Sequence, residues 1–399
     1  MLLFLGMLKF VSQKTCLLIF LVGWSISLSA QEEAIIKRLN QVTKPILTLR
    51  PDSGFQDISF LSDALDGKEV IALGEVTHGT REVFDYKDRL VRYLVSNLNY
   101  KTIVFEADNV GLESLDNYIN GKIDSAPMSS NYKGLFAWLR AYNAKAKDDD
   151  KVHLYGLELR EFSPAIDKVL ALNKALGQGD KEIFLEIKNT PFNRIDKKQL
   201  AKFRTACTHL PESLHRNMLI QLIDNYYKFI GKQRSTIGVR DAFMAENAIA
   251  LKESSKDKKM IIWAHNGHVA KSSLYGKPAM GEYLSKAFGD KYYVIATDIN
   301  KGNVSVIVVG AKNGANALQS LYYPDVDSDK AYEYYFKQCN YKNFILDVRA
   351  AMKDDQLRQF LTEPKEMRMI GGLSTPVNKK LSIADNFDMI VYLNETNSL

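Results

Sequence analysis

The amino-acid sequence predicts an α/β fold: a mostly parallel sheet covered by helices, with an inserted helical lobe. Apolar β-type runs alternate along the chain with helical patterns, and the runs are apolar on both faces, as buried parallel strands are. The β-type runs stop after residue 162 and return after residue 256. The 399 residues, 46% hydrophobic and 25% charged, are enough to build a large core.

Residues 1–30 have the pattern of a signal peptide. Lys9 and Lys14 precede the apolar stretch CLLIFLVGWSISLSA, which ends in the small residues Ser29 and Ala30. The apolar stretch is short for a membrane span. We therefore expect cleavage after Ala30 and export, to the periplasm if the source is a Gram-negative bacterium, with no stable membrane partner afterwards. A retained membrane anchor is the alternative.

The charge balance excludes one class of partner. Cleavage removes two lysines and no acids, so the net charge of +6 falls by 2 to +4, and the chain has no basic block. Binding to nucleic acid is therefore not indicated. Cys207 and Cys339 remain, and the sequence does not show whether they pair. No CxxC pair and no Cys/His zinc spacing is present.

The first part of the α/β core is expected to span residues 31–162. A helical segment, EEAIIKRLNQVTKPI, leads into a β-type run at 69–73, a helix over 82–97 and a strand, KTIVFEAD, at 101–108. Two helical patterns follow, GLESLDNYI and LFAWLRAYNAKAK, and then a buried strand, KVHLYGLEL, at 151–159. The order of strand and helix favours parallel pairing.

The inserted helical lobe is expected at residues 163–256, and the second part of the core at 257–399. The lobe contains Tyr226, Tyr227 and Phe229, a pattern more typical of one buried and one exposed helix face than of a substrate pocket. The second part of the core holds five β-type runs: KKMIIWAHNGHV, KYYVIATDI, NVSVIVVG, KNFILDVRA and FDMIVYLNE.

Titratable side chains follow three of the apolar runs. Glu75 and His78 come after VIALG, Glu106 after TIVF, and His265 and His268 after MIIWA. In open parallel sheets the ligand crevice lies at the carboxyl ends of the strands. Each residue alone is commonly a hydrogen-bonded structural group, but three strand ends with the same chemistry predict a site.

Two kinds of chemistry fit this set of residues. An imidazole with a carboxylate partner is a general base near neutral pH, and a histidine pair can donate hydrogen bonds to an oxyanion. No G-x-S-x-G elbow is present, so attack by an activated water is the hydrolytic route that remains. Alternatively, three histidines and two glutamates could hold manganese or zinc. The spacing of the residues does not decide between activation of water by a base and binding of a metal.

With these residues assembled, the chain resembles the erythromycin esterase family. The resemblance rests on LGEVTHG, FEAD and WAHNGHV, and is reinforced by WLRAYN, VRDAFMAENA, RMIG and FDMIVYLNET in the family order. It covers the chain from about residue 70 to the end. The resemblance implies an erythromycin esterase-like fold and hydrolysis of a carboxylic ester without a cofactor. Relatives that open macrolactones and confer antibiotic resistance are cytoplasmic, so an exported member is expected to meet a different ester.

The resemblance also implies roles for the residues at the strand ends. His78 matches the general base that activates water, and Glu75 and Glu106 match the acids that orient it or the water. His265 and His268 match the histidine pair near the substrate carbonyl.

Three cations outside these strand ends complete the candidate site, and one acid departs from the family pattern. Arg240 matches an arginine that stabilises the oxyanion or steadies the carboxylates, the alternative being an ion pair with Asp241 or Glu246. The candidates for binding the substrate are Arg81 and Lys87, and many family members have arginine at the latter position. Glu158 stands where aspartate is common in the family.

Two functions from other classes remain open on the sequence. More distant relatives include metal-dependent peptidases, which would use Glu75, His78, Glu106, His265 and His268 as ligands of a divalent metal. They also include a haem-binding protein, although no haem motif is visible. Under the leading hypothesis the partner is a small-molecule ester.

Overall fold

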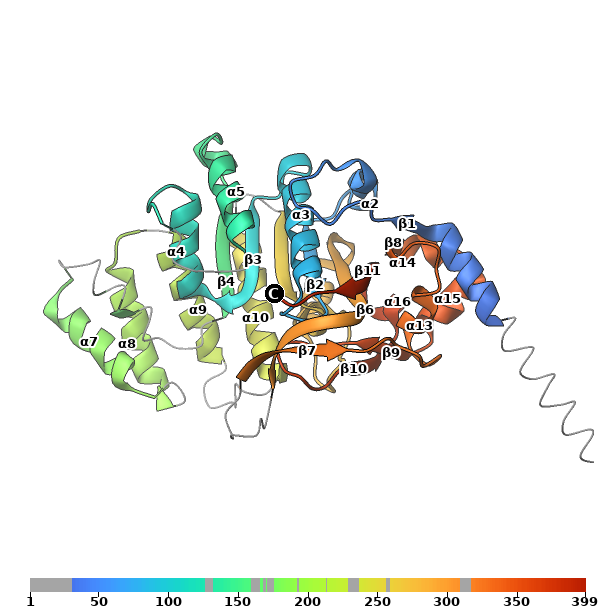
Figure 1. Ribbon diagram of the computed structural model, residues 1–399. Helices are drawn as coiled ribbons and strands as arrows, with labels where there is room; N and C mark the ends of the chain where they lie inside the picture. Colours follow the sequence, from blue (N-terminus) through green and yellow to red (C-terminus); the bar gives the residue numbers. More distant parts are fainter. Residues whose placement is uncertain are drawn as a thin grey trace, which may run out of the picture.

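A sheet of mostly parallel strands runs through the centre of the molecule, with helices on both of its faces (Figure 1). The computed structural model describes residues 31–125, 132–158, 166–167, 170, 176–191, 194–212, 214–228, 237–255, 259–308 and 317–399. Within them the sheet has nine strands in the order β1-β8-β11-β6-β2-β5-β3-β4, with β7 paired to β6. The strands are β1 Thr43–Pro45, β2 Val70–Glu75, β3 Thr102–Asp108, β4 His153–Glu158, β5 Met260–His265, β6 Tyr292–Val308, β7 Ala317–Tyr323, β8 Asn343–Asp347 and β11 Met389–Thr396.

The prediction of a mostly parallel sheet is confirmed. The six neighbouring strands from β11 to β4 are paired in parallel, whereas β1, β7 and β8 are paired antiparallel. Successive side chains of a strand point to opposite faces. Accordingly, Val70 and Ala72 of β2 join one hydrophobic cluster, and Ile71 and Leu73 join the other.

Two strand predictions differ from the structure in detail. The runs KYYVIATDI and NVSVIVVG form one long strand, β6, whose second half leaves the parallel sheet to pair with β7. At Gly302 a Cβ atom would lie 2.0 Å from the carbonyl oxygen of Thr396, so glycine is needed where β6 passes the end of β11. The N-terminal helix covers 31–42 and gives way to β1, because Pro45 disfavours helical backbone in the residue before it. A separate pair, β9 Lys365–Arg368 and β10 Asn378–Leu381, was not predicted.

Helices cover both faces of the sheet. The predicted helices over 82–97, GLESLDNYI and LFAWLRAYNAKAK are present as α3, α4 and α5. The helices used below and their neighbours are α2 Leu61–Ala64, α3 Arg81–Asn97, α4 Asn109–Ile119, α5 Lys133–Asn143, α7 Gln178–Asn189, α8 Lys197–Thr208, α9 Leu214–Lys228, α10 Ile237–Ser254, α11 Asn266–Val269, α12 Met280–Phe288, α13 Tyr332–Phe336, α14 Val348–Ala351, α15 Asp355–Thr362 and α16 Ile383–Asn386.

The segment predicted as a helical lobe contains α7 to α10. Figure 1 shows α7 and α8 at one end of the molecule, beyond α4, and α7, α8, α9 and α10 pack in succession. The last of them, α10, also packs against β4 and α12, so it lies on the sheet. Tyr226 is buried and Tyr227 is exposed, and Phe229 lies outside the described residues. The division into 31–162, 163–256 and 257–399 stays a prediction.

The two remaining cysteines do not pair. Cys207 of α8 and Cys339, after α13, are both free and buried. The predicted signal peptide lies outside the described residues. Among those residues, no helix combines the length and the apolar character needed to cross a membrane.

Candidate active site

The carboxyl ends of β2, β5 and β3 lie side by side, because β5 is paired in parallel with both neighbours. Glu75 and His265, the last residues of β2 and β5, occupy paired positions. Glu106 of β3 accepts a hydrogen bond from the backbone N–H of His265 at 3.0 Å. The ring of His265 lies 5.6 Å from that of His78 and 6.2 Å from that of His268, centroid to centroid. The sheet therefore brings together the five residues predicted to converge.

Glu75 accepts hydrogen bonds from three side chains. Nδ1 of His78 donates to Oε1 at 2.6 Å, and Oε2 accepts from Nζ of Lys87 and Nε1 of Trp263, each at 2.7 Å. The Lys87 ammonium also lies 4.2 Å from the centre of the Trp263 ring. Glu75 and Lys87 are 3% and 0% exposed, whereas the His78 side chain is 41% exposed. The carboxylate is thus fixed inside the protein, and the imidazole that it orients stands at the surface of the site.

The charges of Glu75, Lys87 and His78 shift one another's pKa values. Burial opposes ionisation of Glu75, but the charge of Lys87 and the hydrogen bond from His78 outweigh it and lower the pKa of Glu75 to about 2. Burial lowers the pKa of Lys87 to about 8, although Glu75 opposes the shift. Burial by itself would lower the pKa of His78. The hydrogen bond and the charge of Glu75 outweigh this effect and raise the pKa of His78 above the ordinary 6.5. The carboxylate is therefore ionised at neutral pH.

His265 is neutral and has an unused ring nitrogen. Its Nδ1 accepts a hydrogen bond from the backbone N–H of Gly267 at 3.1 Å. Its Nε2 is buried and has no hydrogen-bond partner among the described residues. Burial, together with the charges of His78 and His268, lowers the pKa of His265 to about 3. Since Nδ1 is the acceptor, the proton of the neutral ring is assigned to Nε2.

A second network holds His268 in the charged form. Nδ1 of His268 donates to Asp241 at 2.7 Å, and Nε2 lies 3.2 Å from Glu106. Burial opposes protonation, but the charge of Glu106 and the hydrogen bond to Asp241 raise the pKa of His268 to about 10. The charge of His268 in turn holds the pKa of Glu106 well below its ordinary value, against the effect of burial. Both partners are therefore ionised at neutral pH.

Arg240 of α10 joins this second network. One of its nitrogens donates to Glu106 at 2.6 Å and also to Glu158, and the other lies 2.9 Å from Nε2 of His268. These contacts differ from the ion pair with Asp241 or Glu246 that the sequence left open. Arg240 is paired with two buried carboxylates, and its two predicted roles in the reaction stay predictions.

A glycine pair closes one side of the site. Gly371, with φ of +63°, accepts a hydrogen bond from the backbone N–H of His78 at 3.3 Å. A Cβ atom at Gly371 would lie 3.6 Å from Nε2 of His265, and one at Gly372 would lie 3.1 Å from the His78 ring. Glycine therefore keeps space open beside both imidazoles.

Comparisons with known proteins identify the family of the chain. The family model of erythromycin esterase matches residues 95–210 and 211–396. The chain belongs to the erythromycin esterase family. Erythromycin esterase type II of Escherichia coli is 22% identical to it over 324 residues, covering 66% of this chain and 76% of the relative. A Bacillus subtilis protein named "Putative hydrolase YbfO" is 23% identical over 301 residues, covering 60% and 67%. Membership of this family makes the chain a hydrolase.

Solved structures show that this erythromycin esterase family member has the erythromycin esterase-like fold. A succinoglycan biosynthesis protein superposes with a TM-score of 0.78 at 22% identity, covering 92% of this chain and 98% of the other. A Bacillus cereus protein gives 0.75 at 23% identity with the same coverage. A histidine-to-asparagine mutant of the erythromycin esterase EreC, in its open conformation, gives 0.63 at 17%, covering 89% and 97%.

An apolar cavity of about 130 Å³ adjoins the catalytic candidates of this esterase family member. Its polar end consists of Glu75, His78 and Glu106. The rest of its wall comes from β3, α4, β5, α5 and the residue before α5, and it is apolar or aromatic: Phe105, Ala107, Leu112, Leu115, Tyr132, Phe136 and Trp263.

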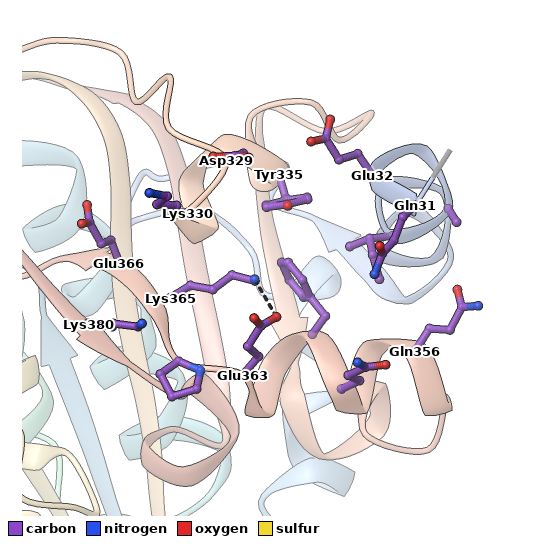
Figure 2. A pocket seen from close by; sticks show the side chains of 15 residues that line it. Gln31, Glu32, Asp329, Lys330, Tyr335, Gln356, Glu363, Lys365, Glu366 and Lys380 are labelled. Carbon is purple, nitrogen blue, oxygen red and sulfur yellow. Dashed lines mark hydrogen bonds and ion pairs between the residues drawn. The ribbon is translucent and has the colours of Figure 1, made fainter. Parts of the chain in front are cut away.

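A larger cleft of about 840 Å³ shares no lining residue with this cavity. Figure 2 shows its side chains, which come from the N-terminal helix, α13 and the residues before it, α15 and the residues after it, and the β9–β10 pair. Acidic and basic groups both line it, and Lys365 is paired with Glu363 at 2.9 Å. The histidines of the site lie elsewhere, so the smaller cavity is the one next to the candidate chemistry.

One expectation for this family member was wrong and one stays untested. Lys87 does not line a substrate surface, because it is completely buried and its ammonium is held by Glu75. Its charge acts on the carboxylate that orients His78. Arg81 is exposed at the first residue of α3, and its predicted contact with substrate stays a prediction.

Sequence reasoning missed three contributors to the site. Trp263, in WAHNGH, donates to Glu75 across the β2–β5 pair, and Asp241 supports His268. Gly371, in RMIGG, faces His265. The pairing of polar groups could not be foreseen, but each of the three lies within or directly beside a motif that was recognised.

Proposed function

We propose that the chain hydrolyses a carboxylic ester by attack of a water molecule that His78 activates. The observation that carries the proposal is a pair of imidazoles whose hydrogen-bond partners assign them opposite tautomers. Nδ1 of His78 donates to Glu75, so the lone pair of the neutral ring lies on Nε2. Nε2 of His265 instead carries a proton and is without a partner among the described residues. One ring can accept a proton and the other can donate a hydrogen bond.

The reaction follows from these two nitrogens. Nε2 of His78 takes a proton from water as the water oxygen bonds to the ester carbonyl carbon. The carbonyl oxygen gains negative charge and accepts a hydrogen bond from Nε2 of His265. The intermediate then breaks its bond to the alcohol oxygen, and His78 returns the proton to it. The products are a carboxylic acid and an alcohol, and Glu75 stays ionised beside the transient imidazolium.

The second network supports the oxyanion donor. Glu106 accepts from the backbone N–H of His265, and its own position is held by Arg240 and His268. Because these groups are ionised and mutually paired, they fix the backbone of His265 without taking up its Nε2. We assign them a positioning role.

The alternative, a metal-dependent hydrolase, fits the donor set less well. In the part of the chain that the structure describes, no group of three or more His, Cys, Asp or Glu side chains is arranged to hold a metal ion. The two carboxylates are already paired with cations, Glu75 with Lys87 and Glu106 with Arg240. The positive charges of Lys87 and Arg240 would both repel a divalent cation added to this cluster. We therefore derive no step through a metal.

Turnover of 4-nitrophenyl acetate by the purified protein tests the proposal. Hydrolysis is expected to persist after dialysis against a chelator, since no step needs a metal. The measurement combines the initial rate before and after dialysis with elemental analysis of the same sample. Activity that disappears on chelation and returns with one divalent metal would contradict the proposal and restore the metallohydrolase.

The pH profile of kcat/KM reports the base. Since Glu75 raises the pKa of His78 above 6.5, activity of the wild type is expected to increase with pH through an apparent pKa above that value. Glu75→Gln removes the carboxylate, so the acid limb should move to lower pH while kcat falls. Asp180→Asn, which alters the Asp180–His209 pair at the surface, is the control and should leave the profile unchanged. An acid limb at the same pH in Glu75→Gln would rule out the pairing as the origin of the shift.

A further inference from the structure

The cavity beside the candidate catalytic groups has a rigid aromatic wall. The Phe105 and Trp263 rings are stacked at a centroid distance of 5.9 Å, and Tyr132 contacts Trp263 edge-on at 5.3 Å. Phe136 lies 5.7 Å from Tyr132, and Leu115 of α4 is 3% exposed. Such packed rings have few alternative rotamers, so the shape of the wall is preformed.

The size of the cavity limits what it can hold. An apolar cavity of about 150 Å³ accepts a benzene molecule, whereas pockets for drug-sized ligands measure roughly 300–1,000 Å³. The cavity here, at about 130 Å³, matches one phenyl ring or a branched aliphatic group of similar size. A macrolactone or a long straight acyl chain exceeds it.

The position of His78 decides which half of the ester faces the cavity. Its side chain is 41% exposed, and its ring must return a proton to the departing alcohol. The alcohol therefore leaves on the exposed side of His78. The acyl group, on the other side of the carbonyl carbon, is then directed toward the apolar wall.

We propose that the cavity binds the acyl group of the ester and that this group is compact and apolar, of the size of a phenyl ring. The inference rests on the ester hydrolysis proposed above. We take Leu115 and Phe136 as the residues to vary in size, because both line the cavity with apolar side chains, one from α4 and the other from α5.

The test compares 4-nitrophenyl esters of acetic, phenylacetic and decanoic acid. The wild type should prefer phenylacetate over acetate in kcat/KM by about tenfold or more, as expected for burial of a phenyl group, and should also prefer it over decanoate. Leu115→Phe fills the cavity and should lower the phenylacetate-to-acetate ratio about tenfold. Phe136→Leu enlarges it and should favour the 1-naphthylacetate ester. Leu139→Phe, at a buried position that does not line the cavity, is the matched control.

The ratio of two substrates in one sample is independent of the folded fraction, so a loss of stability cannot imitate the result. Equal ratios in the wild type and both cavity variants would overturn the inference and leave ester hydrolysis standing. If no ester is cleaved, the proposed function fails, and binding of neutral phenylacetamide, measured by calorimetry, decides about the cavity. If phenylacetamide binds and Leu115→Phe weakens the binding at least tenfold, the assignment of the cavity is supported. If phenylacetamide does not bind, the assignment is overturned.

Discussion

His78→Ala is expected to lower kcat/KM for 4-nitrophenyl ester hydrolysis by about 10²–10⁴-fold, the contribution typical of a general base. The substitution removes a ring that is oriented by the buried carboxylate of Glu75 and is open to the surface. Stability should change little, because much of the side chain is already exposed. The measurement pairs steady-state kinetics with the thermal midpoint of unfolding.

His209→Ala is the matched control for this loss. His209 is also a partly exposed histidine paired with an acid: it directly follows α8, and its partner Asp180 lies in α7. Figure 1 shows these two helices at one end of the molecule, beyond α4. His209→Ala should retain full activity. Full activity in His78→Ala, with the protein folded, would exclude His78 as the base.

Lys87→Met is expected to lower the free energy of unfolding by about 3 kcal/mol at pH 7, the cost of leaving one partner of a buried ion pair alone. Lys87 is completely buried, and its ammonium lies 2.7 Å from Oε2 of Glu75, whose charge it compensates. Its own desolvation, which lowers the pKa of Lys87 to about 8, is relieved in the variant and offsets part of the loss. Denaturant unfolding at several pH values measures the change.

The pH dependence of this effect has a definite sign. The pKa of Glu75 is lowered in the folded state, from 4.5 to about 2, so its contribution to stability is complete above pH 4.5 and lost as the pH falls toward 2. The difference between wild type and Lys87→Met should therefore be largest above pH 4.5 and narrow on acidification. The double variant Glu75→Gln/Lys87→Met carries no buried charge at either position and should recover most of the lost stability. A constant difference across the pH range would contradict the charge-pair explanation.

The strands that could be predicted are those that are buried along their length and therefore consist of continuous apolar runs. Val70–Glu75 and Met260–His265 are buried along their whole length, so their apolar runs mark them without reference to any partner. In contrast, β7 is largely exposed and pairs only with β6, and its sequence, ALQSLYY, has no pattern that demands a sheet. The short strand β1 depends on its pairing with β8, which is some 300 residues away in the chain.

The candidate site was predictable as a set of residues but not as a set of contacts. Acids and histidines at the ends of buried strands are costly unless they are paired or functional, which is why Glu75, Glu106 and His265 could be selected. Lys87 was assigned to the substrate because its position in α3 does not reveal that it points inward to Glu75.

The sequence alone was sufficient for the parallel α/β core and for the acids and histidines that gather at one edge of it. Only the tertiary structure decided which distant residues hold the acids: Trp263 binds Glu75 from 188 positions away, and Arg240 binds Glu106 from 134 positions away. The tautomers of His78 and His265 follow from near neighbours in the chain, Glu75 and Gly267, whereas the charge of His268 comes from Glu106 of β3 and Asp241 of α10. The reason is physical: strand-forming runs are a local property of the chain, whereas a proton's position depends on burial and on charges a few ångströms away, whichever part of the chain supplies them.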